Sequence, residues 1–312
     1  MKQVWISEKG APEALQLREA PAPTAAPGQL RIQVAYSGVN FADIQARMGQ
    51  YPDAPPVPCV VGYEVSGTVD QVGSGVSGFN EGDRVLSFTR FGGYSDTVVV
   101  ESGWAHKVPE GVSLESAAAI PVNYATAWTM LIRQGALQPG ETVLVHSAGG
   151  GVGLAALQIC RWRGAVAIGT ASSGKHARLR EMGYAHCIDY RSQDFEREVM
   201  HYSDGRGVDM VLDPQGGSSF RRSYRCLAPL GRLCMFGMAG SVQGERMRPL
   251  ALARELLTTP WFHPLSLINN NRGVFGTNMG RLFDEFDRLS PDMVEIVRLL
   301  GQGTLAPVVD LV

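Results

Sequence analysis

The chain has 312 residues, of which 45% are hydrophobic and 19% are charged, and its formal net charge is −2. This composition is that of a globular protein with one large core or two smaller ones, and the lack of any Lys- and Arg-rich tract argues against a nucleic-acid partner. Every apolar run is shorter than a membrane span and the first residues carry no apolar signal stretch, so we expect neither a membrane span nor a secretory signal.

Up to about residue 120, short strand-like runs alternate with turn residues. Val-rich runs separated by Gly, Asn and Asp are typical of antiparallel or barrel-like β structure. The predicted strands lie at 2–7, 29–39, 63–73, 83–88 and 92–100.

After residue 120 the pattern changes to strands that alternate with helices. Such alternation predicts a parallel sheet that is covered by helices on both faces. The predicted strands lie at 142–146, 165–170, 186–190, 208–213, 232–237 and 271–277. The first predicted helix follows the strand at 142–146 and ends near Arg163, and the others span 175–183, 193–203 and 218–231. The pattern at 279–303 predicts a long amphipathic segment.

The connection from Gly240 to Asn271 is longer than a plain helical crossover and is rich in apolar residues. Two interpretations stay open: a helix that packs on the sheet or on a partner subunit, or an apolar lid or lipid-contacting surface. Its large apolar residues are Leu256, Leu257, Trp261, Phe262, Leu265 and Leu267.

A glycine-rich run, "HSAGGGVG", joins the strand at 142–146 to the apolar helix that follows it. In a strand–helix–strand unit of about 30 residues this run predicts a dinucleotide-binding turn. Gly150 and Gly151, with Val152 after them, would let the backbone approach a pyrophosphate, and Gly153 would let the helix pack closely. Backbone N–H groups at the helix start would favour the phosphate charge. The alternative is a glycine turn without a ligand.

The end of the next strand carries no acidic residue. An NAD site usually offers Asp or Glu there to the ribose hydroxyls, whereas this chain offers Thr170, Ser172 and then Lys175. Hydroxyl groups and a cation suit a 2′-phosphate, so the sequence predicts NADP(H). Lys175 can also be read as ordinary surface charge, and Tyr190 either as an adenine-stacking ring or as a core residue.

The five cysteines are scattered and form no Cys-x-x-Cys pair. We therefore expect reduced thiols and a cytoplasmic location rather than a disulfide framework.

The order of these parts resembles the medium-chain dehydrogenase/reductase superfamily. The resemblance is to its zinc-independent quinone oxidoreductase branch, and most of all to the vesicle amine transport protein-like subgroup. It is carried by "GVNFADIQARMGQYP" (38–52), "VGYEVSGTVDQVGSGVSGFNEGDRV" (61–85), "AAAIPVNYATAWTML" (117–131), "VLVHSAGGGVGLAALQI" (143–159), "GTASSGKHARLREMGYAHCIDY" (169–190), "VDMVLDPQGG" (208–217) and "GTNMG" (276–280).

The resemblance implies an α/β protein of two domains. A GroES-like β-barrel catalytic domain would comprise residues 1–121, with 281–312 returning to it, and a doubly wound Rossmann domain with a parallel sheet would comprise 122–280. The active cleft would lie between the domains, and a homodimer would form at the edge strand near Val274. Relatives also continue into a further helix and strand after the position of Val312.

The resemblance also assigns roles to single residues. Asn40 would lie beside the nicotinamide ribose, Thr126 near the nicotinamide half, and Lys175 and Tyr190 at the 2′-phosphate and adenosine. Tyr51 would lie near the reacting carbons as a proton donor, although a packed ring is the simpler interpretation. Residues at strand ends would hold the carboxamide side, namely Gly237, Met238, Phe275, Gly276 and Asn278.

Zinc is not expected. Zinc-dependent relatives place a Cys near the position of Asn40 and a His at Tyr63, and neither ligand is present here. Without a metal, the expected reaction is direct hydride transfer to a quinone or an α,β-unsaturated carbonyl. Two alternatives stay open: an enoyl-thioester reductase, and a non-catalytic NADPH-binding protein that acts at a membrane or with a partner.

Overall fold

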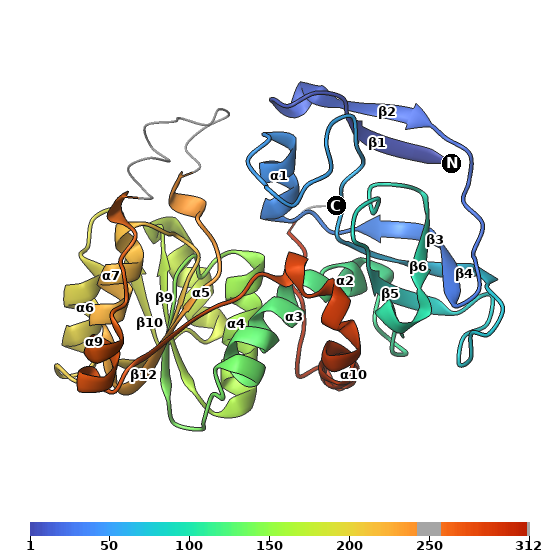
Figure 1. Ribbon diagram of the computed structural model, residues 1–312. Helices are drawn as coiled ribbons and strands as arrows, with labels where there is room; N and C mark the ends of the chain where they lie inside the picture. The colour runs from blue at the N-terminus through green and yellow to red at the C-terminus, as the bar shows by residue number, and fades with distance from the viewer. Residues whose placement is uncertain (242–256, 311–312) are drawn as a thin grey trace. The chain divides into compact units, whose positions relative to one another are not determined.

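A computed structural model describes residues 1–241 and 257–310 of the chain. The chain folds into two compact units: unit 1 comprises Met1–Ala125 and Met279–Val312, and unit 2 comprises Thr126–Asn278 (Figure 1). The fold class is α/β, with antiparallel β structure in unit 1 and a parallel sheet in unit 2. No helix among the described residues is long and apolar enough to cross a membrane.

Unit 1 is built on an antiparallel five-stranded sheet in the order β6-β3-β4-β5-β7, and β1 pairs with β2 in a separate sheet. Leu30 and Ile32 alternate along one face of β3 and are fully buried against Val65 and Val85, which form the core of this unit. The strands are β1 (Lys2–Ile6), β2 (Leu15–Glu19), β3 (Gln29–Ser37), β4 (Glu64–Val72), β5 (Arg84–Phe88), β6 (Thr97–Glu101) and β7 (Ala105–Lys107).

The helices of unit 1 are α1 (Phe41–Arg47), α2 (Leu114–Ala118) and α10 (Phe286–Gly301), and α3 (Pro121–Trp128) spans the boundary between the units. Residues 279–310, which include α10, belong to unit 1 although they follow unit 2 in the chain. The Phe283 and Phe286 rings lie 5.1 Å and 5.7 Å from the Trp104 ring, centre to centre. The buried residues of α10 recur at helical spacing, at Leu289, Met293, Ile296 and Leu300.

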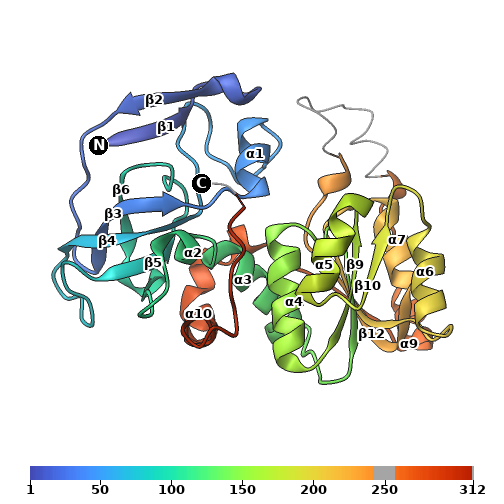
Figure 2. The same ribbon diagram turned by 180° about the vertical axis from the view of Figure 1, so that it is seen from behind.

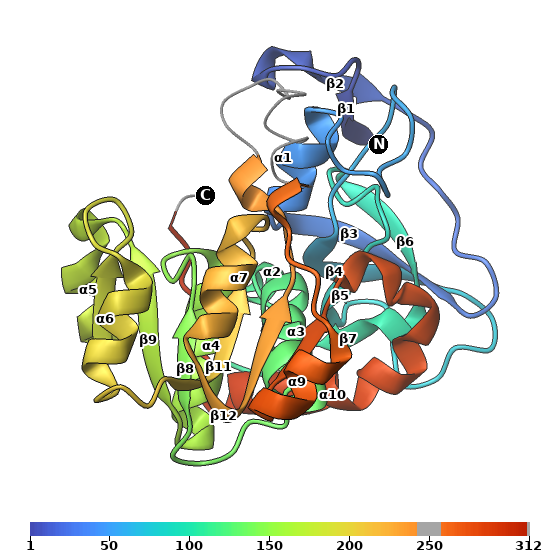
Figure 3. The same ribbon diagram turned by 60° about the vertical axis from the view of Figure 1, so that its left-hand side comes forward.

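In unit 2, the described residues form one parallel six-stranded sheet in the order β10-β9-β8-β11-β12-β13. Numbered from β8 along the chain, this is the 3-2-1-4-5-6 order of a doubly wound sheet. Figure 3 shows β9, β8, β11 and β12 in this order across the sheet. The strands are β8 (Thr142–Val145), β9 (Val166–Ala171), β10 (His186–Asp189), β11 (Val208–Asp213), β12 (Leu227–Met235) and β13 (Gly273–Gly276).

Helices cover both faces of this sheet. Figures 1 and 2 show α4 and α5 on one face and α6, α7 and α9 on the other. These helices are α4 (Gly151–Arg163), α5 (His176–Met182), α6 (Phe195–Tyr202), α7 (Ser218–Arg225) and α9 (Pro264–Asn270), and a π-helical turn at Thr129–Gln134 continues α3. Short 3₁₀ turns lie at Pro12–Ala14, Ser102–Trp104, Ser173–Lys175, Ala239–Ser241, Met279–Arg281 and Phe283–Glu285.

The predicted helix at 218–231 is wrong in its second half. Helix α7 ends at Arg225, and β12 begins at Leu227, which pairs with Val208 of β11 and is buried together with Ala228. The turn-like "APLG" inside this strand is accommodated at Leu230, which takes a φ of 66° and is 82% exposed.

The connection 240–271 is described only in part. Residues 242–256, and with them Leu256, lie outside the described residues. Phe262 packs on the ring of Tyr224 with 5.3 Å between ring centres and lies against the core of unit 2. Leu257 and Trp261 are 85% and 99% exposed.

All five cysteines are buried free thiols. Burial raises the pKa of each of them, and that of Cys160 to about 12.

Candidate functional site

The carboxyl ends of the six parallel strands of unit 2 bring together most of the residues that the sequence singled out. In open sheets of this kind, ligands bind outside these strand ends. Grouped by the strand that they end or follow, the residues are Gly150, Gly151, Val152 and Gly153 (β8), Thr170, Ser172 and Lys175 (β9), Tyr190 (β10), Gly237 and Met238 (β12), and Phe275, Gly276 and Asn278 (β13). Thr126 lies instead in α3, where it is 9% exposed.

The glycine turn after β8 has no space for a side chain at Gly153. A β-carbon at Gly153 would lie 2.6 Å from the carbonyl oxygen of Ser147 and 2.7 Å from that of Ala148, so only glycine fits there. Ser147 itself takes a φ of 56°, in the left-handed region that a residue with a side chain rarely adopts. Helix α4 begins at Gly151, so its first N–H groups point out of the turn as an anion site requires.

Lys175 lies against this turn. A β-carbon at Gly149 would meet the Cδ of Lys175 at 2.9 Å and its Nζ at 3.5 Å, so this exposed side chain lies along the glycine run. Tyr190 is 57% exposed and stacks with the Arg191 guanidinium at 5.7 Å, which excludes its interpretation as a core residue.

Thr170 faces the interior. It is 3% exposed, and its Oγ1 lies 3.0 Å from Nδ1 of His146, which is 4% exposed. The Thr170 hydroxyl therefore faces His146 in the interior and not a 2′-phosphate, which corrects the contact expected from the sequence.

A buried polar network around Asp213 was not anticipated from the sequence. Asp213 has no exposed surface and accepts hydrogen bonds from Ser219 (2.7 Å) and Ser223 (2.6 Å). Ser223 in turn lies 3.1 Å from Nε2 of His146. A sequence signal did exist: His146 and Asp213 each end or follow an apolar strand, and strands β8 and β11 are neighbours.

In unit 1, Asn40 is held by a buried carboxyl group. Its Nδ2 donates to Oε1 of Glu64 at 2.8 Å, and Oε2 of Glu64 accepts from the N–H of Val122 at 2.7 Å, at the start of α3. Burial raises the pKa of Glu64 to about 7. A β-carbon at Gly38 would collide with the Glu64 carboxyl, which explains the glycine in "SGVN".

A second carboxyl group fixes the backbone beside Asn40. Asp43 accepts from the N–H of Asn40 at 2.9 Å and from the N–H of Gly62 at 3.0 Å. Burial nevertheless raises the pKa of Asp43. Asn40 is thus oriented through both its amide and its backbone.

Tyr51 and Tyr63 line a pocket of about 230 Å³ in unit 1, together with Phe91. The Tyr51 and Tyr63 rings meet edge to face with 6.1 Å between their centres. Burial raises the pKa of both phenols, so each keeps its proton at neutral pH. The rest of the lining is Asp53, Arg90, Gly280, Arg281 and Asp284, in which Arg281 pairs with Asp53 at 2.9 Å and Arg90 with Asp284 at 3.4 Å.

Tyr63 occupies the position at which the zinc-dependent pattern has a histidine, and it is 5% exposed among aromatic rings. Within residues 1–241 and 257–310, no three His, Cys, Asp or Glu side chains lie close enough to hold a metal ion together.

Comparisons with known proteins match the chain over nearly its full length. A family model described as zinc-binding dehydrogenase matches residues 151–295, and one described as alcohol dehydrogenase GroES-like domain matches residues 26–110. The human synaptic vesicle membrane protein VAT-1 homolog is 42% identical over 299 residues, which cover 96% of this chain and 76% of that protein.

Two solved structures are also similar. A quinone oxidoreductase from Pseudomonas syringae pv. Tomato superposes with a TM-score of 0.82 at 31% identity, over 97% of this chain and 89% of the other. Mycobacterial Rv1454c, whose structure was solved in complex with NADPH, superposes with a TM-score of 0.83 at 29% identity, over 98% of this chain and 90% of the other.

Proposed function

This chain belongs to the medium-chain dehydrogenase/reductase superfamily, and from that premise we propose that it is an NADPH-dependent reductase of quinones or α,β-unsaturated carbonyls. The observation that carries the proposal is the Lys175 ammonium group, which lies on the glycine turn where β9 ends without a carboxylate. A fixed cation near hydroxyl groups favours a phosphate over a bare ribose.

In this proposal, the strand ends of unit 2 bind the cofactor. N–H groups in the first turn of α4 donate hydrogen bonds to the pyrophosphate oxygens, and Lys175 and Ser172 bind the 2′-phosphate. Tyr190, exposed beside β10, stacks on the adenine. The nicotinamide supplies the hydride when the cofactor is bound.

Unit 1 supplies the groups that act on the substrate. Asn40 is oriented by Glu64 and Asp43 and positions the nicotinamide ribose. Tyr51 keeps its proton because burial raises its pKa, and it donates that proton to the reduced acceptor. The pocket lined by Tyr51, Tyr63 and Phe91 suits a planar acceptor such as a quinone ring, because aromatic rings pack against planar groups.

The direct test is oxidation of NADPH by the purified chain with a benzoquinone, a naphthoquinone, an enone and an enoyl thioester, with NADH in parallel. Turnover of a quinone or enone that is faster with NADPH is the expected result. Preference for the enoyl thioester would favour the carrier-linked alternative, and tight NADPH binding without any turnover would favour a non-catalytic role.

Tyr51→Phe separates the two sources of the proton. If Tyr51 donates it, this variant should lose about 10²-fold or more in kcat with the enone while its affinity for NADPH is unchanged. An unchanged kcat would assign the proton to water. Tyr202→Phe, on α6 in unit 2, is the matched control.

A further inference from the structure

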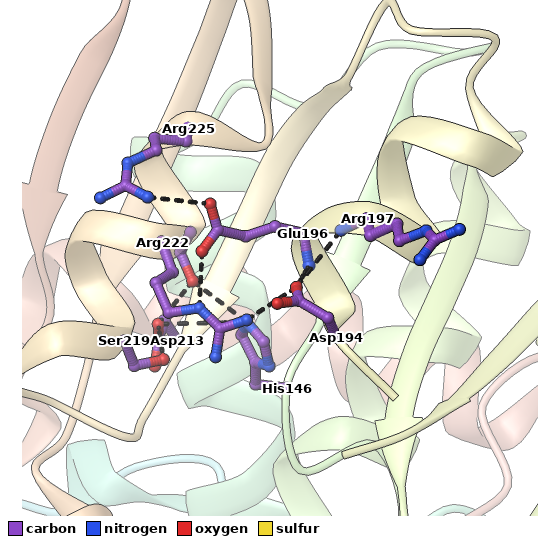
Figure 4. Close-up of polar contacts among 9 residues, drawn as sticks. His146, Asp194, Glu196, Arg197, Asp213, Ser219, Arg222 and Arg225 are labelled. Carbon is purple, nitrogen blue, oxygen red and sulfur yellow. Dashed lines mark hydrogen bonds and ion pairs between the residues drawn. The ribbon is translucent and has the colours of Figure 1, made fainter. Parts of the chain in front are cut away.

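We propose that Asp213, acting through Ser223 and His146, is a positioning residue for the two loops that follow β8 and β11. The proposal concerns the cofactor-binding ends of the sheet and, in its effect on affinity, rests on the proposed function. Figure 4 shows the residues around this network, with His146, Asp213 and Ser219 at its centre.

The network has a direction, and Asp213 sets it. A carboxylate can only accept hydrogen bonds. Oδ1 of Asp213 accepts from the N–H of Gln215 at 2.7 Å, and Oδ2 accepts from the hydroxyls of Ser219 and Ser223 at 2.7 Å and 2.6 Å. Each serine therefore donates its single hydroxyl hydrogen to Asp213.

The hydrogen bond from Ser223 to Asp213 also determines which nitrogen of His146 carries the hydrogen. Because the Ser223 hydrogen points to Asp213, the Ser223 oxygen accepts from Nε2–H of His146 at 3.1 Å. Nδ1 of His146 is then an acceptor, and the Thr170 hydroxyl donates to it at 3.0 Å. Burial lowers the pKa of His146, so the ring is neutral and carries its hydrogen on Nε2.

Among the described residues, no Lys or Arg side chain pairs with Asp213, and Nε2 of His146 lies 4.0 Å from its Oδ2. Arg222 extends to Glu196 at 2.6 Å and to Asp194 at 2.8 Å (Figure 4). It also lies over the Phe195 ring, with 4.2 Å from its guanidinium carbon to the ring centre. Asp213 is thus a buried carboxylate held by a backbone N–H and hydroxyls. Such a group contributes little net stability compared with apolar packing, which favours a role in fixing geometry.

The same residues tie the two loops together at their outer side. Gln215, whose N–H is bound by Asp213, donates from Nε2 to Oγ of Ser147 at 2.8 Å. Ser147 follows His146 directly and opens the glycine turn in a left-handed conformation, with a φ of 56°. A strained residue persists only where its surroundings hold it, and here they hold it from both sides.

Histidine NMR on the chain without ligand tests the direction of the network. We expect Nε2–H at His146, identified by the loss of its signal in His146→Asn. In Asp213→Asn the new amide keeps its oxygen on the Gln215 N–H and donates to both serines, so the chain reverses and His146 should carry Nδ1–H. An Nδ1–H wild type, or an unchanged tautomer in Asp213→Asn, would overturn the proposal. A residue that merely fills space would not move the tautomer.

The second experiment tests positioning, with Ser223→Ala and its matched control Ser219→Ala. Both variants lose a hydroxyl on Asp213, but only Ser223 contacts His146. Ser223→Ala should speed amide exchange at Ala148 and Gly150 and weaken NADPH binding about tenfold, and Ser219→Ala should change affinity less than twofold.

Equal effects of the two alanines, or slow exchange retained in Ser223→Ala, would refute positioning. Faster exchange in Ser223→Ala together with a wild type that does not bind NADPH would instead refute the proposed function and leave the positioning of the loops supported.

Discussion

The Glu64 carboxyl links two parts of unit 1 because it binds the Asn40 side chain with one oxygen and the first turn of α3 with the other. Glu64 is buried, with 1% of its surface exposed to solvent. Neither contact can be read from the sequence, in which Asn40, Glu64 and Val122 are widely separated. Because Glu64 is buried, its protonation should change the free energy of unfolding of the whole chain.

Glu64→Gln should remove this pH dependence. The pKa of Glu64 is raised from 4.5 to about 7, so this group's contribution to stability is full below pH 4.5 and is lost as the pH rises through 7. The loss amounts to about 3 kcal/mol. A glutamine does not titrate, and its single carbonyl oxygen can accept one of the two hydrogen bonds. Urea unfolding at pH 4.5 and pH 8 should show the variant gaining on the wild type as the pH rises. A gap that stays constant would contradict the assignment.

Lys175→Asp tests the choice of cofactor at the same scale. It should weaken NADPH binding at least about tenfold and NADH binding little, because only the former loses a charge-assisted contact. Fluorescence titration with both cofactors measures this. Arg180→Asp, an equal charge change on α5, is the control. Parallel losses for NADPH and NADH would refute the 2′-phosphate assignment.

At the scale of elements, the glycine turn and α4 depend on one close approach. Gly153→Ala should destabilise the chain by about 1–3 kcal/mol, because its β-carbon would press on two backbone carbonyl oxygens that cannot rotate away. Gly174→Ala, with nothing within 4 Å of the added carbon, should stay within about 0.5 kcal/mol of wild type. Thermal unfolding separates the two, and equal midpoints would contradict the packing described here.

Most of the strands, helices α4 to α6 and the glycine turn could be predicted from the sequence because periodicity and turn residues are local signals. Strands β2 and β7 and the short helices α1 and α2 were not predicted. The start of β12 could not be predicted, since "CLAPLG" reads as a helix end and a turn, and the strand begins there through the pairing of Leu227 with Val208 of β11. The Asp213 network joins residues from β9, β11, α7 and the turn that follows β8, so its geometry required the assembled sheet. The interior position of Thr170 follows from the same network.

At the scale of the whole molecule, we propose that the chain forms a homodimer through β13. This strand ends the sheet, pairing with β12 on one side, and edge strands readily pair with a second copy. Val274→Lys should convert a species of twice the chain mass into a monomer, as measured by light scattering after gel filtration. Leu17→Lys, on exposed β2 in unit 1, is the control. A monomeric wild type would refute the dimer.

The burial of all five thiols makes the wild-type chain nearly inert toward maleimide dyes at neutral pH, since each thiolate is both shielded and disfavoured. Two cysteines introduced on the surface, for example at Leu17 in unit 1 and at Trp261 in unit 2, would then be the preferred sites of labelling. Energy transfer between the two dyes would report the separation of the units in solution, with and without NADPH, and would need no prior removal of the natural cysteines.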